Sequence, residues 1–177
     1  MLQGEADAPT VIFRLPADTD FEALAGIRRD PRMQAMLMAI PDRTDNASVR
    51  DWIERRVNEP GGLFRVMSQP GGPALGFIQI SQVSLRDRYG YGAVAVRDDC
   101  RLPGVALLAM RELMRAARFD LGLLKLMAEI RADNTDSIRM NYLCGYKLIG
   151  TLESHFVDAD GQRHDVVLLQ KKLPPAN

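Results

Sequence analysis

The stretch from Ala93 to Ala106 contains the residues best suited to binding a charged ligand, because an apolar strand pattern there gives way to a loop and then to a helical pattern. Pro103 falls in the first turn of the predicted helix, and a small residue follows at Gly104. The N–H groups of a first helical turn lack partners inside the helix and carry a partial positive charge. A pyrophosphate could bind there, although the ordinary packing of a helix start explains the same residues equally well.

Two motifs carry a resemblance to a known family. The first reads Arg101-x-x-Gly104-x-Ala106, and the second reads Asn134-x-x-Ser137-Ile138 followed by Gly145-Tyr146. In this order and spacing they resemble the signatures of the GNAT superfamily of acyl-CoA-dependent N-acyltransferases. The resemblance covers residues 89–172 and extends more weakly to the N-terminal part of the chain. Residues 147–151 and 160–166 look most like the branch of ribosomal-protein N-terminal alanine acetyltransferases, and enzymes that acylate nucleotide-linked amino sugars share much of this ending.

The resemblance implies acetyl-CoA as the co-substrate, lying across the mouth between the fourth and fifth strands. Its pyrophosphate would rest on the backbone N–H groups of residues 102–106, with Arg97 or Arg101 adding a charge-assisted hydrogen bond. In the family, a backbone N–H of the fourth strand binds the thioester oxygen, and the motif asparagine contacts the pantetheine arm. The implied binding residues are Val94, Ala95, Val96, Arg101, Leu102, Pro103, Gly104, Val105, Ala106 and Asn134.

A base is needed as well, since only a neutral amine attacks a thioester and alkylamines are mostly protonated at pH 7. Some family members use a glutamate on the fourth strand, but residues 89–96 contain none. Glu129 on the fifth strand, Glu153 or His155 could take the role. Glu129 could instead serve only as the partner of a cation on its own strand.

The departing thiolate needs a proton donor. Many family members place a tyrosine seven positions after the motif asparagine, where this chain has Asn141, with Tyr142 next. One residue turns a helix by about 100°, so Tyr142 would point away from the sulfur. Ser137 matches the serine of the resembled branch and competes for the role. The predicted catalytic candidates are therefore Ser137, Tyr142, Glu129 and His155.

Other motifs favour simpler interpretations. Gly90-x-Gly92 fits a dinucleotide-binding pattern, but the chain continues there as a strand and opens no helix. Cys100 precedes a helix start, where a thiolate could be favoured, yet a small loop residue is the better interpretation. His155 and His164 lie on opposite arms of a predicted hairpin without nearby cysteines, so no metal site is predicted. Three methionines within 33–38 could line an acceptor groove or fill gaps.

Hydrophobic periodicity predicts the elements that position these residues. Strands are expected at 11–15, 63–68, 75–84, 89–96, 124–130, 148–157 and 164–171. Helices are expected after Thr19, which opens a capping-box sequence, after Asn46, from Pro103 to Gly122, and from Asn134 to Gly145. The order predicts a single mixed α/β (α+β) domain over residues 9–173, with a sheet of about seven strands and about four flanking helices. Residues 1–8 and 174–177 are predicted to be tails.

Composition limits the partners. Lys and Arg number 23 and Asp and Glu number 23, so no net charge favours binding to nucleic acid or to an anionic membrane. No apolar run approaches the ~20 residues that span a bilayer, and no signal peptide is evident, which predicts a cytoplasmic protein. Cys100 and Cys144 are expected to be reduced thiols.

Together these features predict an acetyl-CoA-dependent N-acetyltransferase. The acceptor would be the primary amine of a small molecule or of a peptide N-terminus, attacking the thioester directly and without a metal. Two alternatives stay open, an N-acetyltransferase for nucleotide-linked amino sugars and a catalytically silent module that binds acyl-CoA. The apolar stretch 166–169 could support a homodimer.

Overall fold

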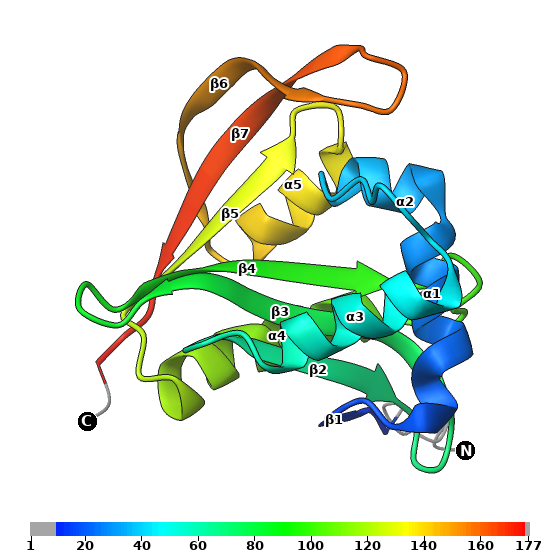
Figure 1. The fold of residues 1–177 in the computed structure, drawn as a ribbon. Helices are drawn as coiled ribbons and strands as arrows, with labels where there is room; N and C mark the ends of the chain where they lie inside the picture. Colours follow the sequence, from blue (N-terminus) through cyan, green and yellow to red (C-terminus); the bar gives the residue numbers. More distant parts are fainter. Residues whose placement is uncertain (1–9, 176–177) are drawn as a thin grey trace, which may run out of the picture.

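Seven strands form one sheet in the order β1-β2-β3-β4-β5-β7-β6, in a computed structural model that describes residues 10–175 (Figure 1). The strands are β1 Ile12–Arg14, β2 Leu63–Ser68, β3 Ala74–Ser84, β4 Tyr89–Val96, β5 Lys125–Arg131, β6 Lys147–Val157 and β7 Arg163–Lys172. Neighbouring strands are antiparallel except β4 and β5, which are parallel. The predicted mixed sheet is thus confirmed. The predicted tail 1–8 and residues 176 and 177 lie outside the described range.

Within the described range the sheet is accompanied by five α-helices, one more than the sequence predicts. They are α1 Phe21–Arg29, α2 Pro31–Met36, α3 Asn46–Val57, α4 Val105–Arg115 and α5 Thr135–Leu143, with a 3-10 turn η1 Asp18–Asp20 and a π-helical turn η2 Ala116–Asp120. The additional helix is α2, whose first residue is a proline. Proline is tolerated there, and the Asp30 carboxylate accepts hydrogen bonds from the N–H groups of Arg32 and Met33. None of these helices is long and apolar enough to cross a membrane.

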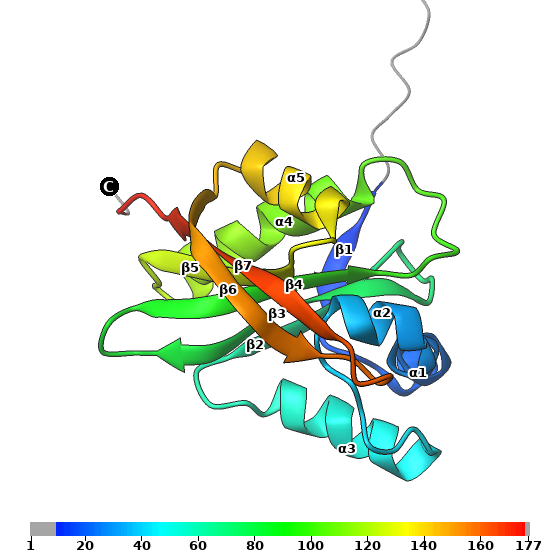
Figure 2. The same cartoon turned by 90° about the horizontal axis from the view of Figure 1, so that it is seen from above.

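Helices lie on both faces of the sheet (Figure 2). On the face that we call the α4 face, Leu113 of α4 is buried in one core with strand residues such as Leu126. On the opposite face, which we call the α1 face, Leu24 of α1 and Trp52 of α3 are buried in a second core with Phe77 of β3. Successive side chains of a strand alternate between these two faces, so each residue of the sheet can be assigned to one of them.

Asp20 is fully buried at the entry to α1, which corrects the capping box predicted at Thr19. Its carboxylate accepts hydrogen bonds from Arg14 at 2.6 and 3.0 Å, and from the N–H groups of Ala17 and Ala74 at 2.8 and 3.1 Å. Burial alone would raise the pKa of Asp20, but these hydrogen bonds outweigh burial and leave the pKa below its usual value. The carboxylate therefore ties β1 and the start of α1 to the first residue of β3.

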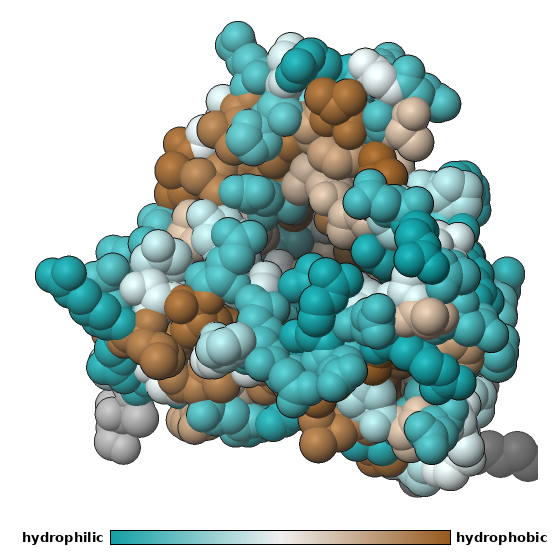
Figure 3. Space-filling view, in the orientation of Figure 1, coloured by the Kyte–Doolittle hydropathy of each residue, from teal (hydrophilic) through white to brown (hydrophobic). Residues whose placement is uncertain are grey.

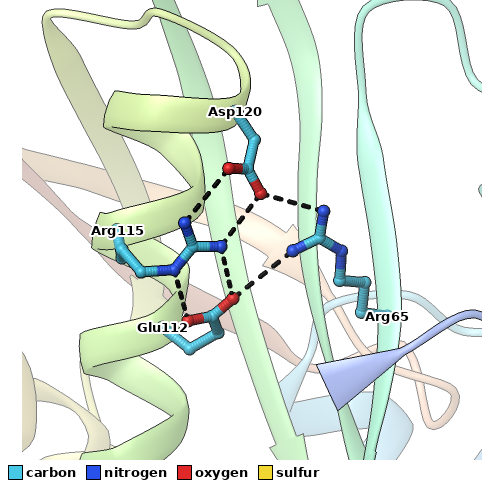
Figure 4. A network of polar contacts seen from close by, with 4 residues as sticks. All are labelled: Arg65, Glu112, Arg115 and Asp120. Atoms are coloured by element: carbon cyan, nitrogen blue, oxygen red, sulfur yellow. Dashed lines mark hydrogen bonds and ion pairs between the residues drawn. The ribbon is translucent and has the colours of Figure 1, made fainter.

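Four charged side chains fasten the end of α4 to β2 (Figure 4). Arg115 donates to Glu112 and to Asp120, and Arg65 of β2 reaches the same two carboxylates at 3.3 and 2.9 Å. Hydrogen bonds from Arg115 and Arg65 lower the pKa of Asp120, although burial alone would raise it. Because Asp120 is the last residue of η2, the network holds this π-helical turn against the sheet.

Candidate active site

β4 and β5 are paired at one end and then separate. Their pairing ends at Tyr91 and Met127, although β4 continues to Val96 and β5 to Arg131. Each separated arm is held by its other neighbour, β4 by β3 and β5 by β7. We call the region between the arms the fork. Its backbone groups have no strand partner on the inner side, and such groups need hydrogen bonds from another source.

The N–H groups of β4 point alternately to β3 and into the fork. Arg97, directly after β4, donates its N–H to the carbonyl oxygen of Leu75 at 2.8 Å. Successive N–H groups of an extended strand point to opposite edges, so Ala95 also directs its N–H to β3, whereas Val94 and Val96 direct theirs into the fork. Of the three residues expected to bind the thioester oxygen, Val94 and Val96 offer a donor. Ala95 does not, and its side chain is buried on the α1 face.

The N-terminus of α4 follows the end of β4 and contains the first motif. Gly104 caps the helix with φ +76°, in the left-handed region that favours glycine. The N–H groups of Gly104, Ala106 and Leu107 have no acceptor among residues 10–175, and a Cβ added at Gly104 would meet nothing within 4 Å. Free N–H groups at the positive end of a helix, beside the open space at Gly104, fit a pyrophosphate.

The two arginines expected near the phosphates are engaged in the loop that precedes α4. Arg97 forms an ion pair with Asp99 at 2.6 Å, and Arg101 donates to the carbonyl oxygen of Asp98 at 2.6 Å. An open cavity of about 300 Å³ borders this loop, lined by Gln69, Leu75, Arg97, Asp99, Cys100, Arg101 and Leu102. Arg97 uses all three guanidinium nitrogens in hydrogen bonds and must give some of them up to contact a phosphate, whereas Arg101 uses only Nη1 toward the described residues.

α5 begins at the second motif, directly after the β5 arm. Asn134 caps the helix, its Oδ1 accepting the N–H of Ser137 at 3.3 Å. The side-chain NH₂ group of Asn134 and the partly buried hydroxyl of Ser137 have no partner in the described part of the chain. Asn141, at the family's tyrosine position, is buried and donates to the carbonyl oxygen of Ser137, whereas Tyr142 is 48% exposed. Asn134 and Ser137 thus lie beside the fork, and Tyr142 lies on the solvent-exposed side of α5.

Glu129 lies on β5 just beyond the last pair with β4, and its side chain is exposed. The sequence left open that a cation of the same strand neutralises it. Arg131, however, binds Asp133 at 2.6 Å, and the Lys125 ammonium lies 5.4 Å from the centre of the Tyr89 ring. Within residues 10–175, Glu129 forms no ion pair, so its carboxylate is free to receive an amine.

Tyr91 was not predicted as a site residue. It is four residues from Ala95 on β4, so both side chains face the α1 face; Met127, opposite Tyr91, and Glu129, two residues further, share that face. Burial raises the pKa of Tyr91, and the Glu129 carboxylate raises it further. Figure 3 shows a hollow on this face near the centre of the view. Only the strand register places Tyr91 at the fork, which is why the sequence gives no signal for it.

The other predicted bases lie away from the fork. Glu153 and His155 are exposed on β6, an edge strand of the sheet, in an irregular stretch where Ser154 has φ +48°. β5 and β7 separate that strand from β4. His164 of β7 binds the Asp158 carboxylate through its Nε2 at 2.7 Å and so helps to close the hairpin.

The glycines of the dinucleotide-like pattern lie within a strand. Gly90 and Gly92 lie inside β4, where an added Cβ would approach Ile80 and Leu113 to 2.9 Å, so these glycines serve close packing. Cys100 and Cys144 are free thiols, and burial raises the pKa of Cys144. Across residues 10–175, no three His, Cys, Asp or Glu side chains cluster as metal ligands would.

Residues 10–147 match the family model described as an acetyltransferase (GNAT) domain. The chain belongs to the GNAT acetyltransferase family. Membership confirms the expectation of an acetyltransferase that uses acetyl-CoA as its acetyl donor. The ribosomal-protein branch within the superfamily is not confirmed. Comparison with functionally curated proteins finds no match.

Solved structures share the GNAT fold of this chain. A spermidine N-acetyltransferase from Vibrio cholerae, crystallised with CoA and spermine, has a TM-score of 0.81 at 12% identity, covering 92% of this chain and 95% of its own. The protein yncA from Salmonella typhimurium, crystallised with acetyl-CoA, has a TM-score of 0.76 at 21% identity, covering 95% of this chain and 96% of its own. At these identities the comparison establishes the fold.

Proposed function

We propose that this GNAT enzyme acetylates the primary amine of a small molecule at the fork, with Glu129 as the base and Ser137 as the proton donor. The fork carries this proposal, because the glycine-capped start of α4 lies at the end of one arm and the asparagine-capped start of α5 at the end of the other. The spermine-bound and acetyl-CoA-bound neighbours support a small-molecule amine and this acetyl donor.

The N–H groups that have no acceptor in the described chain would bind acetyl-CoA. Those of Gly104, Ala106 and Leu107 would hold its pyrophosphate, and the side-chain amide of Asn134 would bind its pantetheine arm. Acetyl-CoA supplies the thioester carbonyl on which the amine acts. The N–H of Val94 points into the fork and would bind the carbonyl oxygen as negative charge grows there. Removing one such donor typically costs about 2.7–4 kcal/mol of transition-state stabilisation.

Two side chains carry out the proton transfers of the reaction. Glu129 takes a proton from the ammonium group, so that the neutral amine forms the C–N bond while the C–S bond breaks. Ser137 donates its hydroxyl proton to the departing sulfur, since this hydroxyl has no competing acceptor in the described chain. The second proton, which the acylated nitrogen loses, replaces the proton of Ser137 by way of water, and Glu129 releases its own proton to solvent. Peptide N-termini and nucleotide-linked amino sugars remain further acceptor candidates of the same chemistry.

The role of Glu129 is tested by thiol release from acetyl-CoA in the presence of primary amines. Glu129→Gln should lower kcat/KM by about 10²–10⁴-fold at pH 7, and the deficit should shrink at higher pH, where more of the amine is already neutral. Glu153→Gln, an exposed glutamate on β6, is the matched control and should leave kcat/KM unchanged. Equal effects of both variants would contradict the assignment. Binding of acetyl-CoA without turnover of any amine would instead favour the silent module.

A further inference from the structure

Among the described residues, the strands on the α1 face beside the fork carry one carboxylate without an ion pair, that of Glu129, among several cations. Directly paired residues and residues two apart on a strand share a face. By this register, the cations on the face of Glu129 are Lys125, Arg131, Lys147 and Lys172. Lys172 is opposite Lys125, and Lys147 stands in the row of Met127. Glu129 is therefore surrounded by positive side chains on the strands of the β5 arm.

Most of this positive charge is not neutralised. Arg131 alone among these cations has an acidic partner, since Asp133 accepts two hydrogen bonds from it at 3.0 and 2.6 Å. Lys125, Lys147 and Lys172 form no ion pair with any carboxylate that the structure describes. Such a face attracts a cation at the carboxylate and repels a second cation around it.

Lys125 and Lys147 lie roughly 10–13 Å from Glu129, a distance that a small acceptor can span. Strand residues advance by about 3.3 Å, which puts Lys125 roughly 13 Å along β5 from Glu129. Lys147 stands two strands away, roughly 10 Å across the sheet. When the amine of a heptyl chain contacts Glu129, the group at the other end of that chain lies within reach of these lysines. Their side chains are long and flexible.

The helices of the α1 face add another cation without a carboxylate partner. Arg28 of α1 donates to the Gln34 side chain at 2.7 Å and to the Ala39 carbonyl oxygen at 2.8 Å, and it lies 5.2 Å from the centre of the Trp52 ring. Burial and the neighbouring arginines of α3 lower its pKa. The acidic residues of α3 line a separate open hollow of about 800 Å³, and no residue of the fork borders it.

We propose that the acceptor carries a single amine and, about a heptyl chain away, an anionic group such as a carboxylate or a phosphate, and that polyamines are disfavoured. This inference rests on the proposed function, with Glu129 receiving the amine. It separates the specificity of this enzyme from that of the Vibrio cholerae neighbour, which was crystallised with the polycation spermine.

Four acceptors of matched length test this inference, namely 7-aminoheptanoate, 7-aminoheptyl phosphate, heptylamine and 1,7-diaminoheptane. At saturating acetyl-CoA and low salt, kcat/KM should rank the anionic amines above heptylamine and heptylamine above the diamine, by about tenfold at each step. The differences should shrink at high salt. The two anionic acceptors show whether a carboxylate or a phosphate is preferred. A diamine that equals or exceeds heptylamine overturns the inference and leaves the acetyltransferase activity standing, whereas no turnover of any acceptor overturns both.

Charge reversal at Lys147 tests whether the lysines cause the preference for an anionic acceptor. Lys147→Glu should remove the preference for 7-aminoheptanoate and raise kcat/KM for the diamine by about tenfold, and Lys147→Ala should shift both in the same direction by less. Arg86→Glu changes the net charge equally at an exposed residue between β3 and β4 and should leave the ranking unchanged. Equal shifts in Lys147→Glu and Arg86→Glu would show a general charge effect and overturn the inference.

Discussion

Gly104 provides both the left-handed backbone at the helix cap and the open space beside it, and one substitution tests both. An alanine is strained at its φ of +76°, by about 1–2 kcal/mol, and its methyl group would project into the open space beside the helix cap. Gly104→Ala should therefore raise the dissociation constant for acetyl-CoA by about tenfold or more, as expected for loss of a charge-assisted hydrogen bond worth roughly 1.5–3 kcal/mol. Isothermal titration calorimetry measures this constant.

Gly161 provides the matched control for Gly104. It has φ +80° in the turn between β6 and β7, and a Cβ there would also meet nothing within 4 Å. Gly161→Ala should lower the thermal midpoint about as much as Gly104→Ala while leaving acetyl-CoA binding unchanged. If both variants weaken binding alike, the cause is strain, and the assignment of the pyrophosphate to α4 is wrong.

Ser137 and Tyr142 compete for the role of proton donor. Ser137 lies partly buried in the first turn of α5 and its hydroxyl lacks a partner in the described chain, whereas Tyr142 is exposed. We expect Ser137→Ala to lower kcat by about 10²-fold with little change in acetyl-CoA binding, and Tyr142→Phe to leave kcat near the wild-type value. Steady-state kinetics with one amine measure kcat for both variants. Loss of turnover in Tyr142→Phe, and not in Ser137→Ala, would reverse the assignment.

At the scale of elements, Asp20 joins β1, α1 and β3 through a fully buried carboxylate. Asp20→Ala leaves Arg14 and two N–H groups without their acceptor, and breaking a buried pair in this way typically costs about 3–5 kcal/mol. Asp18→Ala, at an exposed residue of the same turn, should change the free energy of unfolding by less than about 0.5 kcal/mol. Urea denaturation compares them, and similar losses would contradict the structural role of Asp20.

The same carboxylate predicts a pH dependence. The folded-state pKa of Asp20 lies below the unfolded value of about 3.9. Its contribution is therefore complete above that unfolded pKa and is lost as the pH falls through the folded pKa, because the unfolded state binds the proton first. Between pH 5 and pH 3, the stability of the wild-type protein should fall more steeply than that of Asp20→Asn. Parallel curves would show that Asp20 titrates alike in both states.

Local signals in the sequence predicted most elements of the sheet and both motif-bearing helix starts. The run 89–96 is β4 as predicted, and Asn134 and Gly145 bound α5 as predicted. The helix α2 was missed because its capping aspartate and first proline resemble a loop. The turn at Thr19 was misassigned because Asp20 is recruited by Arg14, a contact that only the tertiary fold creates.

At the scale of the whole molecule, the resemblance implied a mouth between the fourth and fifth strands, but hydrophobic periodicity could not predict where the fork opens. It depends on which strand pairs end early, and pairing between β4 and β5 joins segments that lie far apart in the chain. The pairing of β4 with β3 directs the N–H of Ala95 away from the fork, and the pairing of β4 with β5 places Tyr91 on the same face as Glu129. The domain bounds, a cytoplasmic location and a homodimer stay predictions.

The central claim is that the fork and the start of α4 bind acetyl-CoA. Amide chemical shifts of the ¹⁵N-labelled protein, followed during titration with acetyl-CoA, test it residue by residue. The largest changes should fall on Val94, Val96, Leu102 and residues 104–107, with a further change at Asn134, and the amides of the edge strand β6 should be unchanged. Unchanged amides at millimolar acetyl-CoA, or changes confined to another part of the chain, would contradict the account.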